Sequence, residues 1–117
     1  MGRQVHRPLE DREFDFVLGM IEGPVLVHFT GSWPKAMETG RVMDALLAEL
    51  AEEYGTRLTA VRADITRCPA ATRRYEVTGA PTVLLLRGAD EVVARHEGPL
   101  TREGFRAFLD AHVEPAS

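Results

Sequence analysis

The chain has 117 residues, of which 44% are hydrophobic and 27% are charged, a composition typical of a soluble globular protein. Its formal net charge of −4 argues against nucleic acid as a partner, because phosphate binding needs a concentrated basic surface. No apolar run is long enough to cross a bilayer and the first residues lack the apolar core of a secretory signal. We therefore expect a cytoplasmic protein without a membrane partner, built as a single domain over residues 1–117.

The first half of the chain alternates helix and strand patterns. Residues 1–8 are polar and predict a short edge strand or a loose arm. Apolar residues recur at offsets of three and four over residues 10–22 and again over residues 34–54, which is the spacing of helices with one buried face. Between these helices, residues 25–29 form a β-branched and aromatic run, which predicts a central strand buried on both faces.

The second half ends in a hairpin and a closing helix. We predict strands over residues 58–64, 82–87 and 91–96, and helices over residues 68–75 and 101–113. The early alternation of strand and helix implies parallel strands, and the hairpin adds antiparallel ones. The order β-α-β-α-β-α-β-β-α therefore predicts an α/β fold with a mixed central sheet and helices on both faces.

The single cysteine, Cys68, excludes an internal disulfide and a metal site built from several thiolates. It begins a predicted helix and follows Arg67, and both features lower the pKa of a thiol. A monothiol enzyme or redox sensor acting through Cys68 is therefore one hypothesis, although a lone cysteine is more often a small packed side chain. His28 has no second histidine or carboxylate at metal-ligand spacing, so we predict no metal site and no cofactor.

The segment around Trp33 is the most informative part of the sequence. A buried strand pattern ends at Phe29 and a long helix pattern follows, so Trp33 lies on the turn that joins them. In this and other segments, in the same order and at similar intervals, the chain resembles the thioredoxin family over roughly residues 12–113. The segments that carry the resemblance are Phe14-Asp15, Glu22 to Val27, Trp33, Val77 to Thr82, and Gly98 to Ala111.

The resemblance implies the thioredoxin fold, an α/β architecture with a central mixed sheet of about five strands flanked by four helices. It also implies a cis-proline loop at Pro81 and a domain core over about residues 12–113. The predicted order of helices and strands agrees with this fold.

The departures from the family fall at the positions that carry its chemistry. Family members have Cys-Gly-Pro-Cys after the tryptophan, whereas this chain has Pro34-Lys35-Ala36-Met37. The buried acid of the family corresponds to His28, and the lysine beside it on the next strand corresponds to Arg62. Thiol–disulfide exchange needs a thiolate to attack and usually a second thiol to resolve the mixed disulfide. Because nucleophile, resolving thiol and base are all replaced, we predict a redox-inactive protein and not an enzyme.

The resemblance also implies a binding surface, a shallow apolar groove that pairs with an extended peptide by strand addition. We therefore predict a chaperone, adaptor or complex subunit that binds a partner protein or peptide, as a monomer or weak homodimer. A purely structural subunit that uses a helix face remains an alternative, in which Pro34 only starts a helix and Met37 only fills space. The predicted contact residues are Trp33, Pro34, Gly79, Ala80 and Pro81, with Lys35 and Met37 at the margin.

Overall fold

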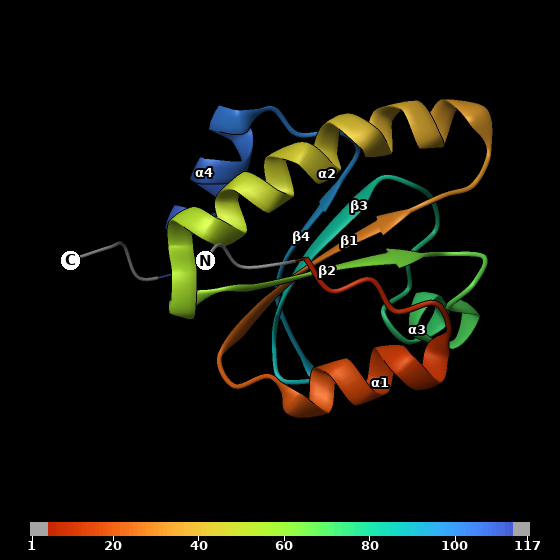
Figure 1. Ribbon diagram of the computed structural model, residues 1–117, viewed down its shortest axis with the longest axis horizontal. Helices are drawn as coiled ribbons and strands as arrows, with labels where there is room; N and C mark the ends of the chain where they lie inside the picture. Colours follow the sequence, from red (N-terminus) through yellow and green to blue (C-terminus); the bar gives the residue numbers. More distant parts are fainter. Residues whose placement is uncertain (1–4, 114–117) are drawn as a thin grey trace.

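A four-stranded sheet lies between two pairs of helices in the computed structural model, which describes residues 5–113 (Figure 1). The strand order is β2-β1-β3-β4, with β1 and β2 parallel and the other two pairs antiparallel. This is the mixed α/β sheet that the sequence predicts. The strands are β1 (Pro24–Thr30), β2 (Thr59–Asp64), β3 (Thr82–Arg87) and β4 (Glu91–Glu97), and the helices are α1 (Asp11–Met20), α2 (Pro34–Tyr54), the short 3-10 turn η1 (Gly55–Arg57), α3 (Pro69–Arg74) and α4 (Arg102–Asp110).

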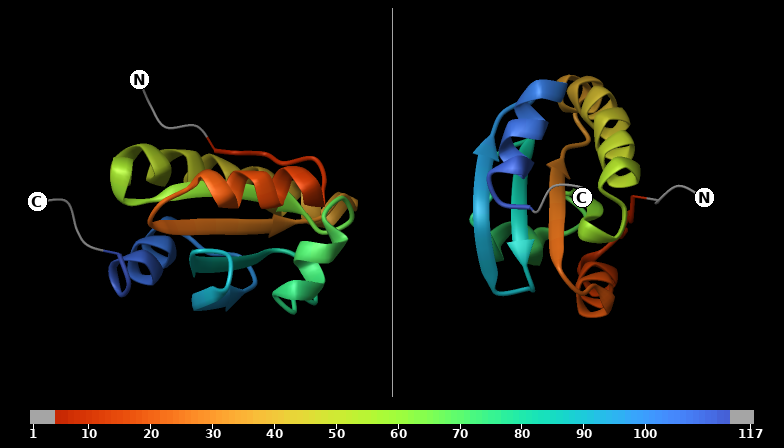
Figure 2. Two further views of the ribbon diagram at one scale, coloured as in Figure 1. Left: turned by 90° about the horizontal axis from the view of Figure 1, so that it is seen from below. Right: turned by 90° about the vertical axis from the view of Figure 1, so that its left-hand side faces the viewer.

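The sheet has four named strands in the described part of the chain, not about five. The segment expected as the additional edge strand makes a single parallel bridge, between His6 and Val61. Pro8 follows two residues later, and its ring removes the backbone N–H that a longer ladder would need. Figure 2 shows this arm along β2 at one edge of the sheet and β4 at the other edge. Residues 1–4 of the expected arm lie outside the described residues.

One face of the sheet packs against α1 and α3. Phe14 of α1, Phe29 of β1 and Tyr75 after α3 form an aromatic cluster, with ring centroids 6.2 to 6.4 Å apart. The same cluster contains Cys68. The hydroxyl of Tyr75 donates to the carbonyl of Ala89 at 2.7 Å, so the one polar atom of the cluster has a partner.

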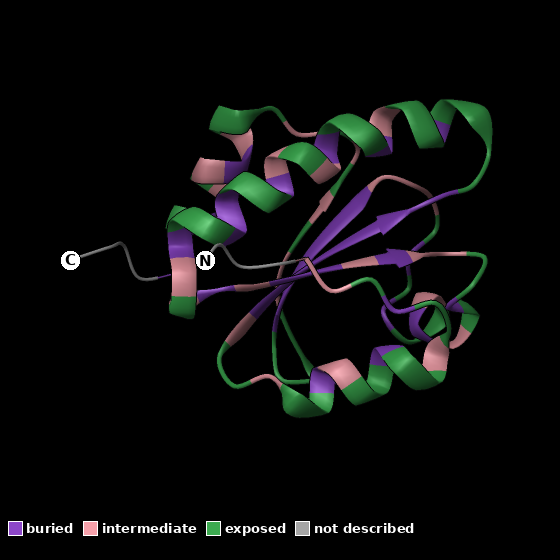
Figure 3. Cartoon of the chain, viewed as in Figure 1, coloured by how far each residue is buried: buried purple, intermediate pink, exposed green. Residues whose placement is uncertain are grey.

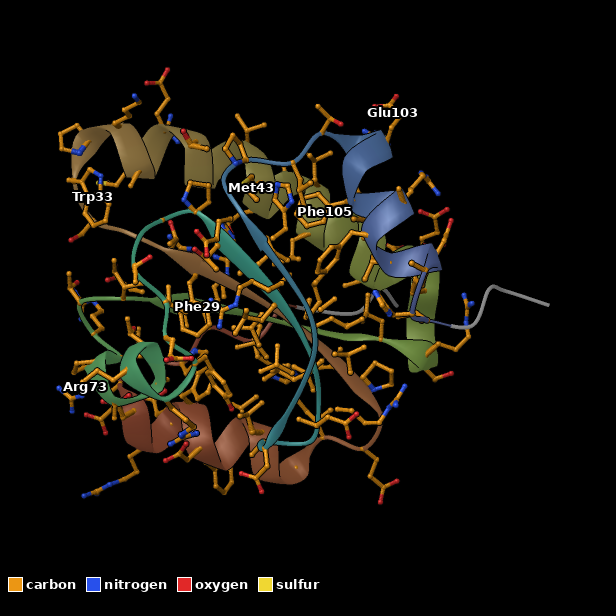
Figure 4. All side chains as sticks on the ribbon, turned by 180° about the vertical axis from the view of Figure 1, so that it is seen from behind. Phe29, Trp33, Met43, Arg73, Glu103 and Phe105 are labelled. Atoms are coloured by element: carbon orange, nitrogen blue, oxygen red, sulfur yellow. The ribbon has the colours of Figure 1, made fainter. Side chains whose placement is uncertain are left out.

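The other face packs against α2 and α4 and is mainly aliphatic. Leu26 of β1 and Leu47 of α2 are fully buried there, and Met43 and Phe105 lie between the two helices (Figure 4). Figure 3 shows β1 and β3 buried over almost their whole length while the outer sides of the helices are exposed. Because β1 is central and buried on both faces, the loop that follows it is held at a fixed place at the end of the sheet.

Candidate functional site

Three segments that are distant in the sequence meet at a surface pocket beside the start of α2. The pocket has a volume of about 430 Å³, within the range of small ligand sites. Its walls come from the first turns of α2, from the loop before β3, and from the loop between β4 and α4. The lining residues are Trp33, Lys35, Ala36, Thr39, Ala80, Pro81, Gly98 and Pro99.

Trp33 is the aromatic wall of this pocket, and its side chain is 42% exposed (Figure 4). The indole lies against the backbone of Gly31, where an added Cβ would come within 2.4 to 2.8 Å of three ring carbons. Gly31 thus allows the ring to lie flat on the chain. The first turn of α2 follows at once, because Pro34 has the fixed φ that favours a helix start.

The loop before β3 forms the opposite wall. The Ala80–Pro81 peptide bond is cis, as the resemblance implies. The carbonyl of Pro81 accepts a hydrogen bond from the amide of Gly98 at 2.8 Å, which ties this loop to the end of β4. The N–H and C=O of Ala80 make no hydrogen bond with any described residue. In this wall of the pocket, Ala80 therefore has one backbone donor and one backbone acceptor that lack a partner.

The pocket includes some predicted contact residues and omits others. Trp33, Ala80 and Pro81 line it, together with Lys35 and Ala36 from the replaced turn. Pro34, Met37 and Gly79 are not among the lining residues. Met37 is about half exposed, and the carbonyl of Gly79 accepts from the hydroxyl of Thr82 at 2.7 Å.

A buried polar cluster lies on the same face of the sheet. His28 is fully buried, and its Nδ1 lies 3.1 Å from Oδ1 of Asp44 on α2. His28 and Arg62 are neighbours in register on β1 and β2, as expected. Nε of Arg62 lies 2.7 Å from Oδ2 of Asp44, an ion-pair contact that lacks the alignment of a hydrogen bond. The Asp44 carboxylate therefore bridges the imidazole and the guanidinium.

Asp44 is the member of this cluster that sequence reasoning missed. Asp44 follows the buried Met43 in the helical pattern of α2 and belongs to the polar side of that pattern and its flanks. Two polar side chains in register on the neighbouring strands β1 and β2, each in need of a partner, are the signal that could have found it. The arrangement resembles a carboxylate–imidazole dyad, but Nε2 of His28 is buried and has no hydrogen-bond partner among the described residues. The dyad thus has no nucleophile within reach.

Cys68 lies on the opposite face of the sheet and is fully buried. Burial, together with the negative charge of Asp11, raises the pKa of this thiol to about 11. The Asp11 carboxylate accepts from the amides of Ala70 and Ala71 at 3.0 and 2.9 Å and so caps α3 itself. The expectation that the helix start and Arg67 would lower the pKa of Cys68 is therefore wrong.

The described residues also bear on metal binding and on membrane crossing. Between residues 5 and 113, no group of three or more His, Cys, Asp or Glu side chains is arranged to hold a metal ion. Over the same stretch, none of the helices combines the length and apolar character that a membrane crossing requires.

The sequence profile of the family described as Thioredoxin matches residues 5–111, almost the whole chain. The protein therefore belongs to the thioredoxin family, and its sheet, helices and cis-proline loop are those of the thioredoxin fold. It carries one cysteine, Cys68, which is remote in sequence from the turn after Trp33.

Curated relatives resemble the chain over most of its length. Thioredoxin C-2 of Corynebacterium nephridii is 30% identical over 92 residues, covering 79% of this chain and 82% of the relative. Thioredoxin of Acidithiobacillus ferridurans is 32% identical over 90 residues, covering 77% and 80%. A thioredoxin-like protein of Synechocystis sp. is 30% identical over 106 residues, covering 91% and 94%.

Proposed function

We propose that this thioredoxin-family chain is redox-inactive and binds an extended segment of a partner protein, as a chaperone, adaptor or complex subunit. The contact surface of this proposal is the groove formed by Trp33 and Pro34 on one side and Gly79-Ala80-Pro81 on the other. A single domain over residues 1–117, a cytoplasmic location and a monomeric or weakly dimeric state belong to the same proposal. The observation that carries it is that both walls of the pocket are present without a thiol between them.

The chemistry of the only cysteine supports the lack of exchange activity. The thiolate is the nucleophile in thiol–disulfide exchange, and a pKa of about 11 leaves only about one thiol in ten thousand ionised near neutral pH. Cys68 is also fully buried, so a substrate disulfide would need the α1/α3 face to open first. The hypothesis of a monothiol enzyme or sensor therefore has less support than binding.

The two walls of the pocket support binding of an extended backbone. Ala80 presents a free N–H and a free C=O, which is what a single residue of an added strand pairs with. Trp33 supplies a large, partly exposed aromatic surface beside it, a residue type enriched at the energetic centres of interfaces. Main-chain pairing and an aromatic anchor together suit a peptide segment.

The test of binding uses Trp33, the only tryptophan, as an internal fluorescent reporter. Extended peptides are selected from a displayed random library against the immobilised protein and are then titrated in solution. We expect the selected peptides to shift the Trp33 emission, and Trp33→Ala to weaken their binding, measured by calorimetry, by about tenfold or more.

Phe16→Ala is the matched control, because Phe16 is an aromatic side chain that is 66% exposed on α1, with Met20 at the next turn of the helix. We expect this variant to bind as the wild type does. Loss of binding with Phe16→Ala and not with Trp33→Ala would contradict the groove and favour the alternative of a structural subunit that uses a helix face.

The test of inactivity is reduction of insulin in the presence of dithiothreitol. We expect no acceleration over the reductant alone, and no difference between the wild type and Cys68→Ser. Catalysis that disappears in Cys68→Ser would instead establish the monothiol enzyme.

A further inference from the structure

The charge of the pocket is confined to one residue. Of the eight residues that line it, only Lys35 is charged. Lys35 is also the only lysine of the chain. No carboxylate of the described residues lies within ion-pair distance of its ammonium group, although five arginines of the chain have such partners. The pocket therefore has an unneutralised cation at its rim.

The start of α2 adds to this positive character. Trp33 gives the helix no side-chain cap, and no acidic residue stands in its first turn. No described residue accepts a hydrogen bond from the amides of Lys35 and Ala36, so two donors of this turn have no partner within the described chain. By contrast, the amides at the start of α4 include one that donates to the hydroxyl of Thr101 at 3.1 Å. Lys35 and the first turn of α2 thus both favour a negatively charged group on a ligand.

Glu97, at the end of β4 before the loop to α4, does not cancel the positive charge of Lys35. Glu97 is in register with Thr82, and Thr82 belongs to the side of β3 that carries Leu84 and Leu86 towards α1 and α3. Because side chains alternate along a strand, Glu97 is directed to the face away from α2. The overall net charge of −4 provides no general attraction for acids either, so any preference for an anion has to arise locally.

From these observations, and resting on the proposed function, we propose that the groove selects an extended segment that places an aspartate or glutamate side chain at Lys35. The carboxylate receives the Lys35 ammonium and the free amides of the first α2 turn, while the segment backbone pairs with Ala80. The proposed carboxylate is that of a side chain within the segment, and a terminal carboxylate is distinguished from it by the test below.

The experiment compares matched peptides on the full-length protein. A peptide selected in the groove is made with Glu, Gln or Ala at each position in turn, and binding is followed through Trp33 fluorescence and calorimetry. We expect one position at which Glu binds about five- to tenfold more tightly than Gln, with the difference shrinking as salt is raised. In Lys35→Ala, we expect this difference to fall to about twofold or less, because only the helix amides remain.

Arg87→Ala is the matched control, since it removes one exposed cation that lines a different pocket, at the start of β1. We expect it to preserve the preference for Glu. Equal binding of Glu and Gln peptides at every position of the wild type would overturn the carboxylate proposal and leave groove binding standing, whereas peptides that do not respond to Trp33→Ala would overturn groove binding itself.

Two outcomes separate the sources of the carboxylate. A preference that follows only the C-terminal carboxylate, and disappears when that end is amidated, would contradict a side chain within a segment. Acetylation of Lys35 gives an independent readout, because it is the only lysine and its modified peptide is unique in a digest. We expect the Glu peptide to slow its acetylation more than the Gln peptide does, and equal protection would contradict the contact.

Discussion

The two faces of the sheet are built differently. The α1/α3 face is an aromatic cluster whose only thiol, Cys68, is sealed inside it. The α2/α4 face is aliphatic but contains the polar cluster of His28, Asp44 and Arg62, and the pocket opens beside it at the start of α2. The one atom that could perform thiol chemistry and the surface that could hold a partner are thus on opposite sides of the sheet.

An acidic side chain has a different effect on each face of the sheet. Asp44 from α2 contacts both His28 and Arg62, so the side chains at these two replaced positions share one polar partner. On the other face, Asp11 neutralises the start of α3 and disfavours the thiolate of Cys68. On the proposed function, the α2/α4 face holds the partner-binding pocket as well as part of the stability, whereas the α1/α3 face contributes to stability alone, and the following changes test that division.

The largest effect is expected from Asp44→Ala. It leaves a buried imidazole without its partner and a guanidinium without its counter-charge, so we expect the free energy of unfolding in urea to fall by about 3 kcal/mol. Asp15→Ala removes the exposed pair with Arg74 on the other side and should cost less than about 0.5 kcal/mol.

A double variant separates lost pairing from lost shape at Asp44. His28→Leu combined with Asp44→Leu replaces the buried polar pair by apolar groups, and we expect it to recover more than half of the lost stability. If the single variant Asp44→Ala were as stable as the wild type, the bridging role of this carboxylate would be wrong.

The second largest effect is a loss of stability at alkaline pH, which comes from one titrating side chain on each face. The pKa of Cys68 is raised to about 11, so its protonated thiol stabilises the fold fully below the ordinary cysteine pKa of about 8.5. This contribution, about 3 kcal/mol, is lost as the pH rises towards about 11. We expect the wild type to lose stability relative to Cys68→Ala between about pH 9 and about pH 11, measured by urea unfolding at each pH.

Tyr54 gives the comparison from the α2/α4 face. Burial and the hydrogen bond to Asp110 raise the pKa of its hydroxyl to about 12. As for Cys68, the pKa is raised in the folded protein, so the stability contributed by the protonated hydroxyl of Tyr54 is lost between about pH 10 and about pH 12. Tyr54→Phe should remove this loss of stability. A Cys68→Ala variant with the same alkaline profile as the wild type would contradict the sealed thiol.

Much of the fold could be predicted because local signals coincide with it. The predicted helix over residues 34–54 has the bounds of α2, since Pro34 starts it and Gly55, with φ of +60°, ends it. The cis bond at Pro81 was implied by the resemblance and is present. Of the two predictions for residues 1–8, a short edge strand or a loose arm, the described part is closer to the arm, because Pro8 interrupts the pairing that began at His6.

The site could be predicted less well because its electrostatics depend on contacts between distant segments. Asp44 has the sequence context of an exposed helical acid, and only the packing of α2 on β1 and β2 brings it to His28 and Arg62. Arg67 is next to Cys68 in sequence, yet burial and the distant Asp11 determine the direction of its pKa shift. Neighbours in sequence were a poor guide to neighbours in space.

The smallest expected effect is a gain, from Glu76→Gly after α3. Glu76 has φ of +53°, the left-handed region that costs a side-chain-bearing residue free energy, and its side chain is exposed. Arg95 donates to the backbone carbonyl of Glu76 at 3.3 Å, a contact that glycine retains. Relief of the backbone strain exceeds the greater freedom of glycine in the unfolded chain, so we expect a gain of about 0.5 to 1 kcal/mol in the free energy of unfolding.

The gain from Glu76→Gly also sharpens the division between the two faces. If the α1/α3 side serves stability alone, the variant should bind groove peptides with the wild-type affinity and give the wild-type Trp33 emission. Glu76→Ala is the control, because alanine keeps the Cβ and hence the strain, and it should be no more stable than the wild type. A change in peptide affinity with Glu76→Gly would mean that the two sides of the sheet are coupled, since Gly79-Ala80-Pro81 follows Glu76 along the same connection.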